Sequence, residues 1–579
     1  MARFWWLMMF SSAALAQGRW FEVQIGGKPA GRAHEVVGPA PAGGIETATD
    51  SQTLIARIDA RLEIRVRVRM TEGGEDGVLR AVHVETDMSA QTTFTDVTIS
   101  GRTATIREQA GKAGVHERRL PLDADLLGPE AVRKRSAAGL RAPGDKLVLP
   151  VWAGELGMPL RALRTVTAVE GAAVRVEEKY QGTPVSRTIW LASDGELLRS
   201  ESPAPFGIIA LVRVNAEPSL SAVELPKDAF ERTLLRSNVR LPQPRALQRM
   251  VVRFPLTADL ASDTQRVVDG LLEVRRAAPP HEPPDADAPG EFLAANVLID
   301  SDDPGVRRIV AQVPGEGWAR ALALTRWTSR NMKFDLGIAF APASELARDR
   351  RGTCVGYATL LASLLRAARI PARIVFGYVY TAGMFGGHAW VEARFGGRWI
   401  PLDAALPSDG PADAARIAAV HDSLRDGAGR VLAALQQVYG KASAEVIEYG
   451  GARAGSAPYR VADREYLNPG LGLSVSAPAG LRFDKLDAVW PDRTLLSLSG
   501  KRGEVQLLED ELDPGLSLGQ ALRAALKEPC RSRSVAGRPG CAARDALAFA
   551  DGATVYVLKA RGDRPEQLLQ AAARGIRLR

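Results

Sequence analysis

The stretch Arg351-Gly-Thr-Cys-Val-Gly-Tyr357 leads into a run of apolar residues with helical spacing. The run consists of Ala358, Leu361, Leu364, Leu365 and Ala368. This spacing predicts a helix that packs on a core and ends before Pro371. Cys354 would then lie at or just before the helix start, where unpaired backbone N–H groups favour thiolate over thiol and lower the cysteine pKa.

Further along the chain, residues 372–380 read as a strand, and residues 388–395 and 398–403 read as two more, joined by the tight turn Gly396-Gly397. In such a hairpin residue 396−k faces residue 397+k, so Asp403 would oppose Trp390. His388 and Asp403 would share one face, one diagonal step and roughly 7–8 Å apart between backbones. The pattern predicts a nucleophile, a base that takes the thiol proton, and a carboxylate that orients the base.

The same residues resemble the transglutaminase-like superfamily over about residues 302–449. The motifs that carry the resemblance are Gly352-Thr-Cys354, the segment from Leu364 to Arg373, Gly377-Tyr378, His388-Ala-Trp390 and Trp399-Ile-Pro-Leu-Asp403. The resemblance implies a papain-like α+β core with Cys354 as nucleophile, His388 as general base and Asp403 as third member. Val355-Gly356 stand where the animal enzymes have Cys-Trp, so crosslinking activity does not carry over with the fold.

The function predicted from this site is cleavage of an amide bond, in a peptide or a glutamine side chain, through a thioester. Either water or an amine could accept the acyl group, giving a peptidase or amidase in one case and a transglutaminase in the other. The oxyanion would meet the Cys354 backbone N–H and a second donor. Trp318 is a candidate for that donor, although a core position is favoured for it, and Trp327 is expected in the core.

Other chemistries are less well supported by the sequence. No close Cys-x-x-Cys or His-x-x-x-His pair accompanies the three residues, which disfavours a zinc site and a thiol-disulfide enzyme. We predict no cofactor and no metal. A binding or assembly protein of the cell envelope, built on the same scaffold without catalysis, remains the alternative.

The N-terminus predicts export. Met1-Ala-Arg3, an apolar segment over residues 4–15 and the ending Ala14-Leu-Ala16 are typical of a signal peptide at residues 1–16. No cysteine follows for lipidation and no other stretch is apolar enough to span a bilayer, so we expect a secreted, periplasmic protein. Of the three cysteines, Cys530 and Cys541 remain once Cys354 is assigned, and their spacing predicts a disulfide.

The net charge of +8 leaves two interpretations, a solvated arginine-rich surface or attraction to an anionic envelope component. Nucleic acid is disfavoured as a partner because the basic residues are dispersed and no recognition motif is present. A protein or peptide substrate is the expected partner.

Around the core, the chain predicts a multidomain α+β protein. Residues 17–240 alternate polar and apolar residues and predict a large antiparallel β region with one wet face. Residues 241–300 predict a small β unit with a flexible Pro-rich loop at 277–290, followed by the catalytic domain at 301–455, including a helix at 429–439. Residues 466–579 predict a small α+β domain, with a capping box of Asp563 and Glu566 before its last helix.

Overall fold

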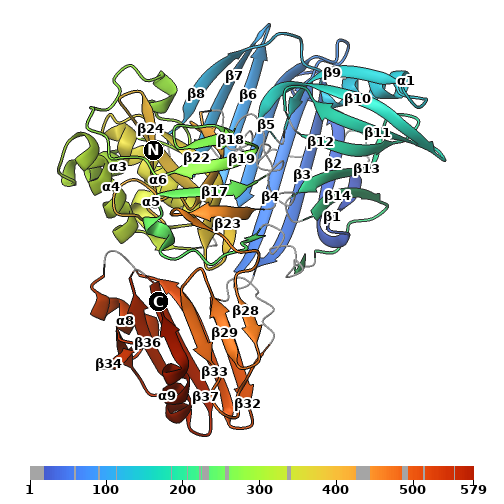
Figure 1. Cartoon of the computed structure of the whole chain (residues 1–579). Helices are drawn as coiled ribbons and strands as arrows, with labels where there is room; N and C mark the ends of the chain where they lie inside the picture. Colours follow the sequence, from blue (N-terminus) through green and yellow to red (C-terminus); the bar gives the residue numbers. More distant parts are fainter. Residues whose placement is uncertain are drawn as a thin grey trace. The chain divides into compact units, whose positions relative to one another are not determined.

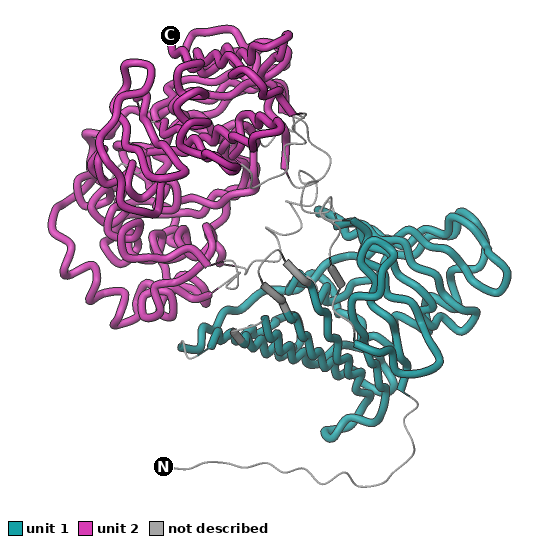
Figure 2. The backbone as a smooth tube through the Cα atoms, turned by 90° about the horizontal axis from the view of Figure 1, so that it is seen from below, with its two compact units in different colours: residues 1–225 teal, residues 226–579 magenta. Residues whose placement is uncertain are grey.

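The computed structural model describes most of the chain (Figure 1). The described residues are 18–57, 60–88, 91–111, 114–154, 156–183, 185–204, 207–220, 223–224, 234–254, 260–335, 341–425, 444–484, 493–512, 516–552 and 554–579. The predicted signal peptide and the predicted helix at 429–439 lie outside these ranges. The chain divides into two compact units, residues 1–225 and 226–579 (Figure 2).

The first unit is built on one sheet of fifteen strands in the order β8-β7-β6-β5-β4-β3-β2-β1-β14-β13-β12-β11-β10-β9, with β15 beside β3. The strands are β1 Arg19–Ile25, β2 Lys28–Pro39, β3 Ile45–Arg57, β4 Ala60–Glu72, β5 Leu79–Met88, β6 Gln91–Ser100, β7 Thr103–Ala110, β8 His116–Pro121, β9 Lys146–Ala153, β10 Met158–Glu170, β11 Ala173–Tyr180, β12 Ser186–Leu191, β13 Leu197–Ala204, β14 Gly207–Val214 and β15 Val223–Glu224. Neighbours along the main order run antiparallel, as the sequence predicts, and Leu127 bridges Val78 to Val151 of the end strand β9. The sheet therefore curves until β9 approaches the start of β5.

One helix of the first unit, α1 (Pro129–Gly139), was not predicted. The carboxylate of Glu72, at the end of β4, accepts hydrogen bonds from the backbone N–H groups of Glu130 (2.9 Å) and Ala131 (3.0 Å). A negative charge at this position satisfies N–H groups that the helix leaves unpaired and complements its dipole. A side chain far away in sequence thus fixes where α1 begins.

The second unit begins with the core that carries the predicted catalytic residues. Its elements are β16 Leu235–Arg236, β17 Arg249–Arg253, β18 Gln265–Val268, β19 Leu271–Arg275, α3 Pro304–Gln312, α4 Gly317–Asn331, β20 Lys333–Phe334, α5 Ala343–Asp349, β21 Arg351–Gly352, α6 Cys354–Ala367, β22 Ala372–Thr381, β23 Met384–Phe395, β24 Arg398–Leu402, β25 Arg416–Asp422, β26 Glu445–Tyr449 and β27 Ala452–Arg453. The main sheet has the order β16-β23-β22-β25, with β24 paired to β23. Helix α6 packs against β22 and β23, and α3, α4 and α5 pack around α6. Leu360, Leu361, Leu364 and Leu365 of α6 are fully buried.

A second sheet, β18-β19-β17-β26-β27, joins strands from the predicted small β unit to strands that follow the catalytic residues. Met250 and Leu272 from this sheet share one apolar cluster with Tyr378 and Phe385 from the main sheet. The Pro-rich segment 277–290 lies at the surface but is anchored, which corrects the prediction of a flexible loop. Asp285 accepts hydrogen bonds from Arg394 Nε (2.8 Å) and from a backbone N–H of the β23–β24 turn (3.0 Å).

The remaining residues form the C-terminal α+β domain. Its elements are β28 Arg460–Ala462, β29 Glu465–Asn468, β30 Leu473–Ser476, β31 Arg482–Phe483, β32 Thr494–Gly500, β33 Gly503–Glu511, α8 Leu518–Leu526, β34 Arg531–Val535, β35 Arg538–Ala542, β36 Ala546–Asp551, β37 Thr554–Gly562, α9 Pro565–Gly575 and β38 Ile576–Leu578. The strands form two sheets, β28-β29-β30-β38 and β31-β32-β33-β37-β36-β35-β34. The multidomain α+β class predicted from the sequence is confirmed.

Two local predictions for the C-terminal domain have opposite outcomes. The disulfide between Cys530 and Cys541 is present and ties the start of β34 to β35. The capping box at Asp563 and Glu566 is wrong, because α9 begins at Pro565 with Arg564 at the N-cap and no side-chain cap.

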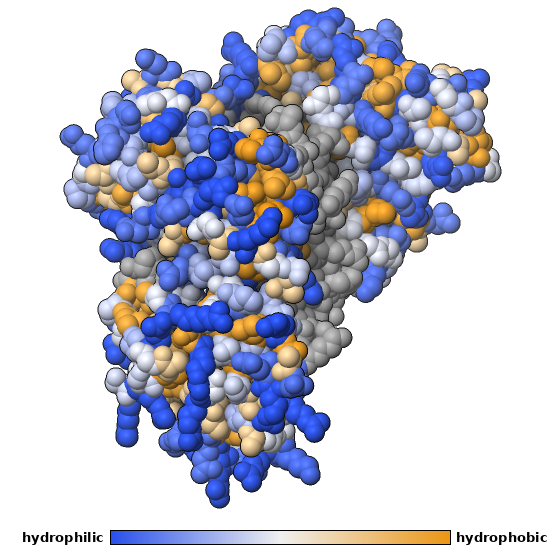
Figure 3. All heavy atoms as spheres, in the orientation of Figure 1, coloured by the Kyte–Doolittle hydropathy of each residue, from blue (hydrophilic) through white to orange (hydrophobic). Residues whose placement is uncertain are grey.

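Hydrophilic residues predominate on the visible face of the described part, with smaller apolar groups between them (Figure 3). Within the described ranges, the helices are all too short or too polar to cross a bilayer.

Candidate active site

Cys354 is the first residue of α6, as the apolar spacing after it predicts. The backbone N–H groups of a first helical turn have no acceptor within the helix, so they are available to an anion beside them. Cys354 is a free thiol and is partly exposed. A nucleophile at this point would combine access to solvent with the positive end of the helix dipole.

The hairpin of β23 and β24 has the predicted register. Phe395 pairs with Arg398 and Val391 with Leu402, which continues to Trp390 opposite Asp403. The turn residues Gly396 and Gly397 have φ of 55° and 78°. Both angles are positive, as a two-residue type I′ turn requires and as glycine adopts without strain.

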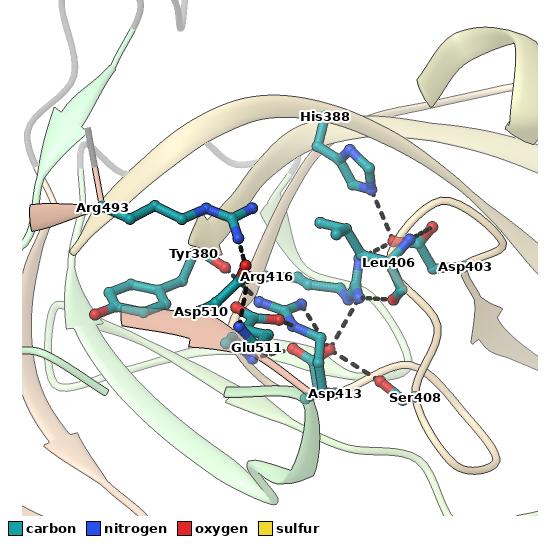
Figure 4. A network of polar contacts seen from close by, with 12 residues as sticks. Tyr380, His388, Asp403, Leu406, Ser408, Asp413, Arg416, Arg493, Asp510 and Glu511 are labelled. Carbon is teal, nitrogen blue, oxygen red and sulfur yellow. Dashed lines mark hydrogen bonds and ion pairs between the residues drawn. The ribbon is translucent and has the colours of Figure 1, made fainter. Parts of the chain in front are cut away.

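His388 and Asp403 meet on one face of this hairpin. Nε2 of His388 lies 2.7 Å from Oδ2 of Asp403, and both side chains are buried (Figure 4). The other oxygen of Asp403, Oδ1, accepts from the backbone N–H groups of Ala405 (2.8 Å) and Leu406 (3.0 Å). The carboxylate is therefore fixed in direction by backbone donors, and it fixes the imidazole in turn.

Cys354 and His388 interact, because each shifts the pKa of the other through hydrogen bonding and through charge. Nε2 is engaged by Asp403, which leaves Nδ1 as the ring nitrogen available to the sulfur. The three predicted residues are thus brought together in one chain of contacts, from Cys354 through His388 to Asp403.

The electrostatics of the site favour a thiolate next to an imidazolium. Burial by itself raises the pKa of the Cys354 thiol, but the hydrogen bond and charge of His388, with the Ala389 backbone N–H, hold that pKa below its usual value. Burial opposes the charged form of His388 as well, yet Asp403 and Cys354 raise its pKa to about 9. Both shifts favour the state in which the shared proton is on the imidazole and the sulfur is ionised.

The structure adds a residue that the sequence pattern did not point to. Arg416, the first residue of β25, donates from Nη1 to Oδ2 of Asp403, the oxygen that also faces His388 (Figure 4). Burial raises the pKa of Asp403, but Arg416 and His388 together hold it well below its usual range. The arginine was missed because it lies beyond the hairpin, in a strand with no chemical motif.

A local irregularity in β25 accompanies this arginine. The register of β22 with β25 shifts between Phe376 and Gly377, and a Cβ at Gly377 would lie 2.0 Å from the Ile417 carbonyl oxygen. The side-chain amide of Gln265 pairs with Ala418 at the same place, donating to its carbonyl (2.8 Å) and accepting from its N–H (2.8 Å). Bulges of this kind change the direction of neighbouring side chains.

The two tryptophans that the sequence points to have different outcomes, since Trp318 contacts a fully buried core residue and Trp327 does not lie in the core. Trp318 makes an edge contact with Phe395, with ring centroids 5.7 Å apart. Phe395 is seven residues along β23 from His388, roughly 23 Å at the rise of a strand, so Trp318 is no oxyanion donor. Trp327 is only half buried and lies under the guanidinium of Arg350, 4.4 Å from ring centroid to Cζ, which corrects its assignment to the core.

Comparisons with solved structures found similarity to several bacterial chains. A putative cysteine protease from Cytophaga hutchinsonii is 19% identical, with 38% of this chain and 85% of that chain covered and a TM-score of 0.23. A putative protease from Parabacteroides distasonis is 10% identical, with 90% of this chain and 95% of that chain covered and a TM-score of 0.15. A β-barrel-like protein of a domain of unknown function from Brucella abortus is 10% identical, with 34% of this chain and 94% of that chain covered and a TM-score of 0.27. No curated protein sequence matches the chain.

The sequence comparison with protein families gave one assignment. Residues 306–404 match the model of the transglutaminase-like superfamily. The matched segment contains Cys354, His388 and Asp403, and runs from α3 to the end of the β23–β24 hairpin. The chain therefore carries a domain of the transglutaminase-like superfamily.

Proposed function

We propose that this protein is a cysteine enzyme that acts on amide bonds through a thioester acyl-enzyme. The observation that carries the proposal is the unbroken chain of contacts from the Cys354 thiol through His388 to the Asp403 carboxylate. A scaffold that only binds a partner has no need for a thiol, an imidazole and a carboxylate in this order. Cys354 acts as nucleophile, His388 as general acid and base, and Asp403 as the residue that orients the imidazole.

The reaction begins with attack of the Cys354 thiolate on the carbonyl carbon of the substrate amide. A C–S bond forms and the carbonyl π electrons move to oxygen, giving a tetrahedral oxyanion next to the N–H groups at the start of α6. The imidazolium of His388 gives its Nδ1 proton to the amide nitrogen, and the C–N bond breaks to release the amine or ammonia. The products of this half are a neutral imidazole and a thioester.

The second half regenerates the enzyme. His388 removes a proton from water or from an amine, which attacks the thioester carbonyl, and the thiolate leaves beside the imidazolium. Water gives a carboxylic acid, as in a peptidase or amidase, whereas an amine gives a new amide, as in a transglutaminase. Through both halves Asp403 stays ionised and keeps Nε2–H in place, because its pKa is held well below its usual range.

We further propose that the protein is exported and works on envelope proteins or peptides. The charged and apolar N-terminal residues support export, and the Cys530–Cys541 disulfide is compatible with an oxidising compartment. The net charge of +8 supports contact with an anionic envelope component.

The test is to incubate the protein with envelope protein extract, with and without a labelled primary amine, and to follow products by mass. Cys354→Ala is the inactive control. New peptide termini that depend on Cys354 identify a peptidase, and ammonia release with amine incorporation identifies acyl transfer. If the wild type and Cys354→Ala give the same products, and iodoacetamide alkylates Cys354 no faster than an ordinary thiol, the non-catalytic binding role is the correct one.

A further inference from the structure

A row of charged side chains, buried except for Glu511 at its far end, continues from Asp403 into the C-terminal domain. Arg416 is 3% exposed and donates through Nη2 to Oδ2 of Asp413 (2.9 Å) and to the carbonyl of Leu406 (3.0 Å). Figure 4 shows that the same guanidinium faces Asp403 on one side and Asp413 on the other. The N–H groups of the planar Arg416 guanidinium therefore bind two carboxylates and a carbonyl at once, a geometry that the ammonium group of lysine cannot reproduce.

Arg245 is the next charged residue in the row. It lies in the 3₁₀ turn η1 (Pro244–Ala246) and donates from Nη1 to Asp413 (2.8 Å) and from Nε to Glu511 (3.0 Å). It also donates to the carbonyl of Tyr380 in β22. Glu511 is the last residue of β33, so the row ends inside the C-terminal sheet.

A second ion pair joins the same two segments. Arg240 lies 3.1 Å from Glu509, two residues before Glu511 on β33, and both side chains are buried. The packing there is close, because a Cβ at Gly552 would lie 1.9 Å from the Gln243 amide nitrogen. The C-terminal domain is therefore held against residues 240–245 at several points.

Charges of opposite sign alternate along the row. In the thiolate–imidazolium state, three cations (His388, Arg416, Arg245) alternate with four anions (Cys354, Asp403, Asp413, Glu511). Removing the carboxylate at the far end makes the electrostatic potential along the row more positive. The imidazolium lies nearer to the row than the thiolate does, so this change disfavours the imidazolium more than it favours the thiolate and shifts the shared proton toward the sulfur.

Stability alone does not explain such a row, because buried ion pairs often contribute little compared with apolar residues of the same size. We propose that Arg416 is a positioning residue for Asp403 and His388, and that Asp413, Arg245 and Glu511 hold it, so that the C-terminal domain completes the catalytic site. This inference rests on the proposed function, because it concerns the same thiolate–imidazolium pair. Arg416 acts through Asp403 and does not touch the reacting atoms.

The test uses alkylation of Cys354 by iodoacetamide, which needs no knowledge of the substrate. The rate constant is measured at pH 6 and at pH 10 on the full, non-reduced chain, and their ratio reports how much thiolate the imidazolium maintains at the lower pH. The variants are Arg416→Lys, which keeps the positive charge but loses the guanidinium hydrogen bonds, and Glu511→Gln, which removes only the negative charge at the far end of the row. Asp510→Asn is the matched control, since Asp510 neighbours Glu511 but pairs with Arg493 at the surface (Figure 4).

We expect a wild-type ratio well above that of an ordinary thiol, a fall of at least about tenfold for Arg416→Lys and of about two- to fivefold for Glu511→Gln, and no change for Asp510→Asn. Thermal midpoints are recorded at both pH values, and the result for Glu511→Gln, whose side chain is partly exposed, is used if Arg416→Lys does not fold. A raised wild-type ratio that both variants keep, even with lowered midpoints, overturns the inference alone. A wild-type ratio equal to that of an ordinary thiol overturns the proposed function, and the inference with it.

Discussion

His388 Nε2 and Asp403 Oδ2 lie 2.7 Å apart although Asp403 comes fifteen positions after His388 in the chain. The two-residue turn at Gly396-Gly397 sets the register of the hairpin, so each residue of β23 has a fixed partner in β24. The contact between His388 and Asp403 follows from that register.

Replacing Cys354 by alanine or serine should abolish turnover, because no other residue at the site supplies a thiolate. The thermal midpoint should stay nearly unchanged, since the side chain is small and partly exposed. Turnover of envelope protein and a melting curve measure the two effects. Activity near that of the wild type in either variant would show that Cys354 is not the nucleophile.

Asp403→Asn should preserve the fold but permit the wrong imidazole tautomer. Loss of the orienting carboxylate costs about 10⁴ in turnover in a serine protease, and we expect roughly 10–10³ here because the thiolate is already formed. His388→Ala should be at least as damaging. Asp409→Asn is the control, because the side chain of Asp409 is 95% exposed and lies 3.5 Å from Arg326. Full activity in Asp403→Asn would mean that another group holds the imidazole.

The pH dependence of turnover should have its alkaline limit near pH 9. The pKa of His388 is raised from 6.5 to about 9, so the imidazolium that protonates the leaving amine is present below this pH and is lost as the pH rises through it. On the acid side, turnover falls only when the thiolate is protonated, at a pH below the usual cysteine pKa of 9.0. A rate profile on a protein that remains folded from pH 5 to pH 10 checks both limits. An alkaline limit near 6.5 would contradict the raised pKa of His388.

The disulfide should stabilise the C-terminal domain without serving catalysis. Cys541 comes eleven positions after Cys530, and closing a loop of this size contributes about 3 kcal/mol in the chain-entropy model. The double variant Cys530→Ala/Cys541→Ala should therefore melt at a lower temperature while Cys354 still alkylates at the wild-type rate. Intact-mass analysis without reductant should find one modifiable thiol in the wild type, and three would exclude the bridge.

The candidate site could be placed from the sequence because its parts are local. Cys354 begins a helix whose apolar spacing is regular, and the register of His388 and Asp403 follows from a turn of two glycines. The Cys530–Cys541 disulfide follows because these are the two cysteines that remain once Cys354 is assigned to the site. In each case the decisive interaction lies within a few residues, or within one hairpin, of the pattern that predicts it.

The parts that could not be predicted depend on contacts between distant segments. Arg416 meets Asp403 because β25 pairs with β22 through an irregular register, and nothing in the sequence marks it. Helix α1 begins where Glu72, far upstream, satisfies its first N–H groups. The last helix begins at Pro565 rather than after Asp563, since proline is favoured in the first turn and its ring needs no N–H partner there.

Gln265 has a consequence for the edge of the main sheet. Strand β25 lies at that edge, and an edge strand leaves N–H and C=O groups without partners in the sheet. The side-chain amide of Gln265 occupies both groups of Ala418, in the manner of a peptide group from a neighbouring strand. Gln265 and Ala418 are both buried, so Gln265→Ala would leave two buried backbone groups without this partner and would lower the thermal midpoint.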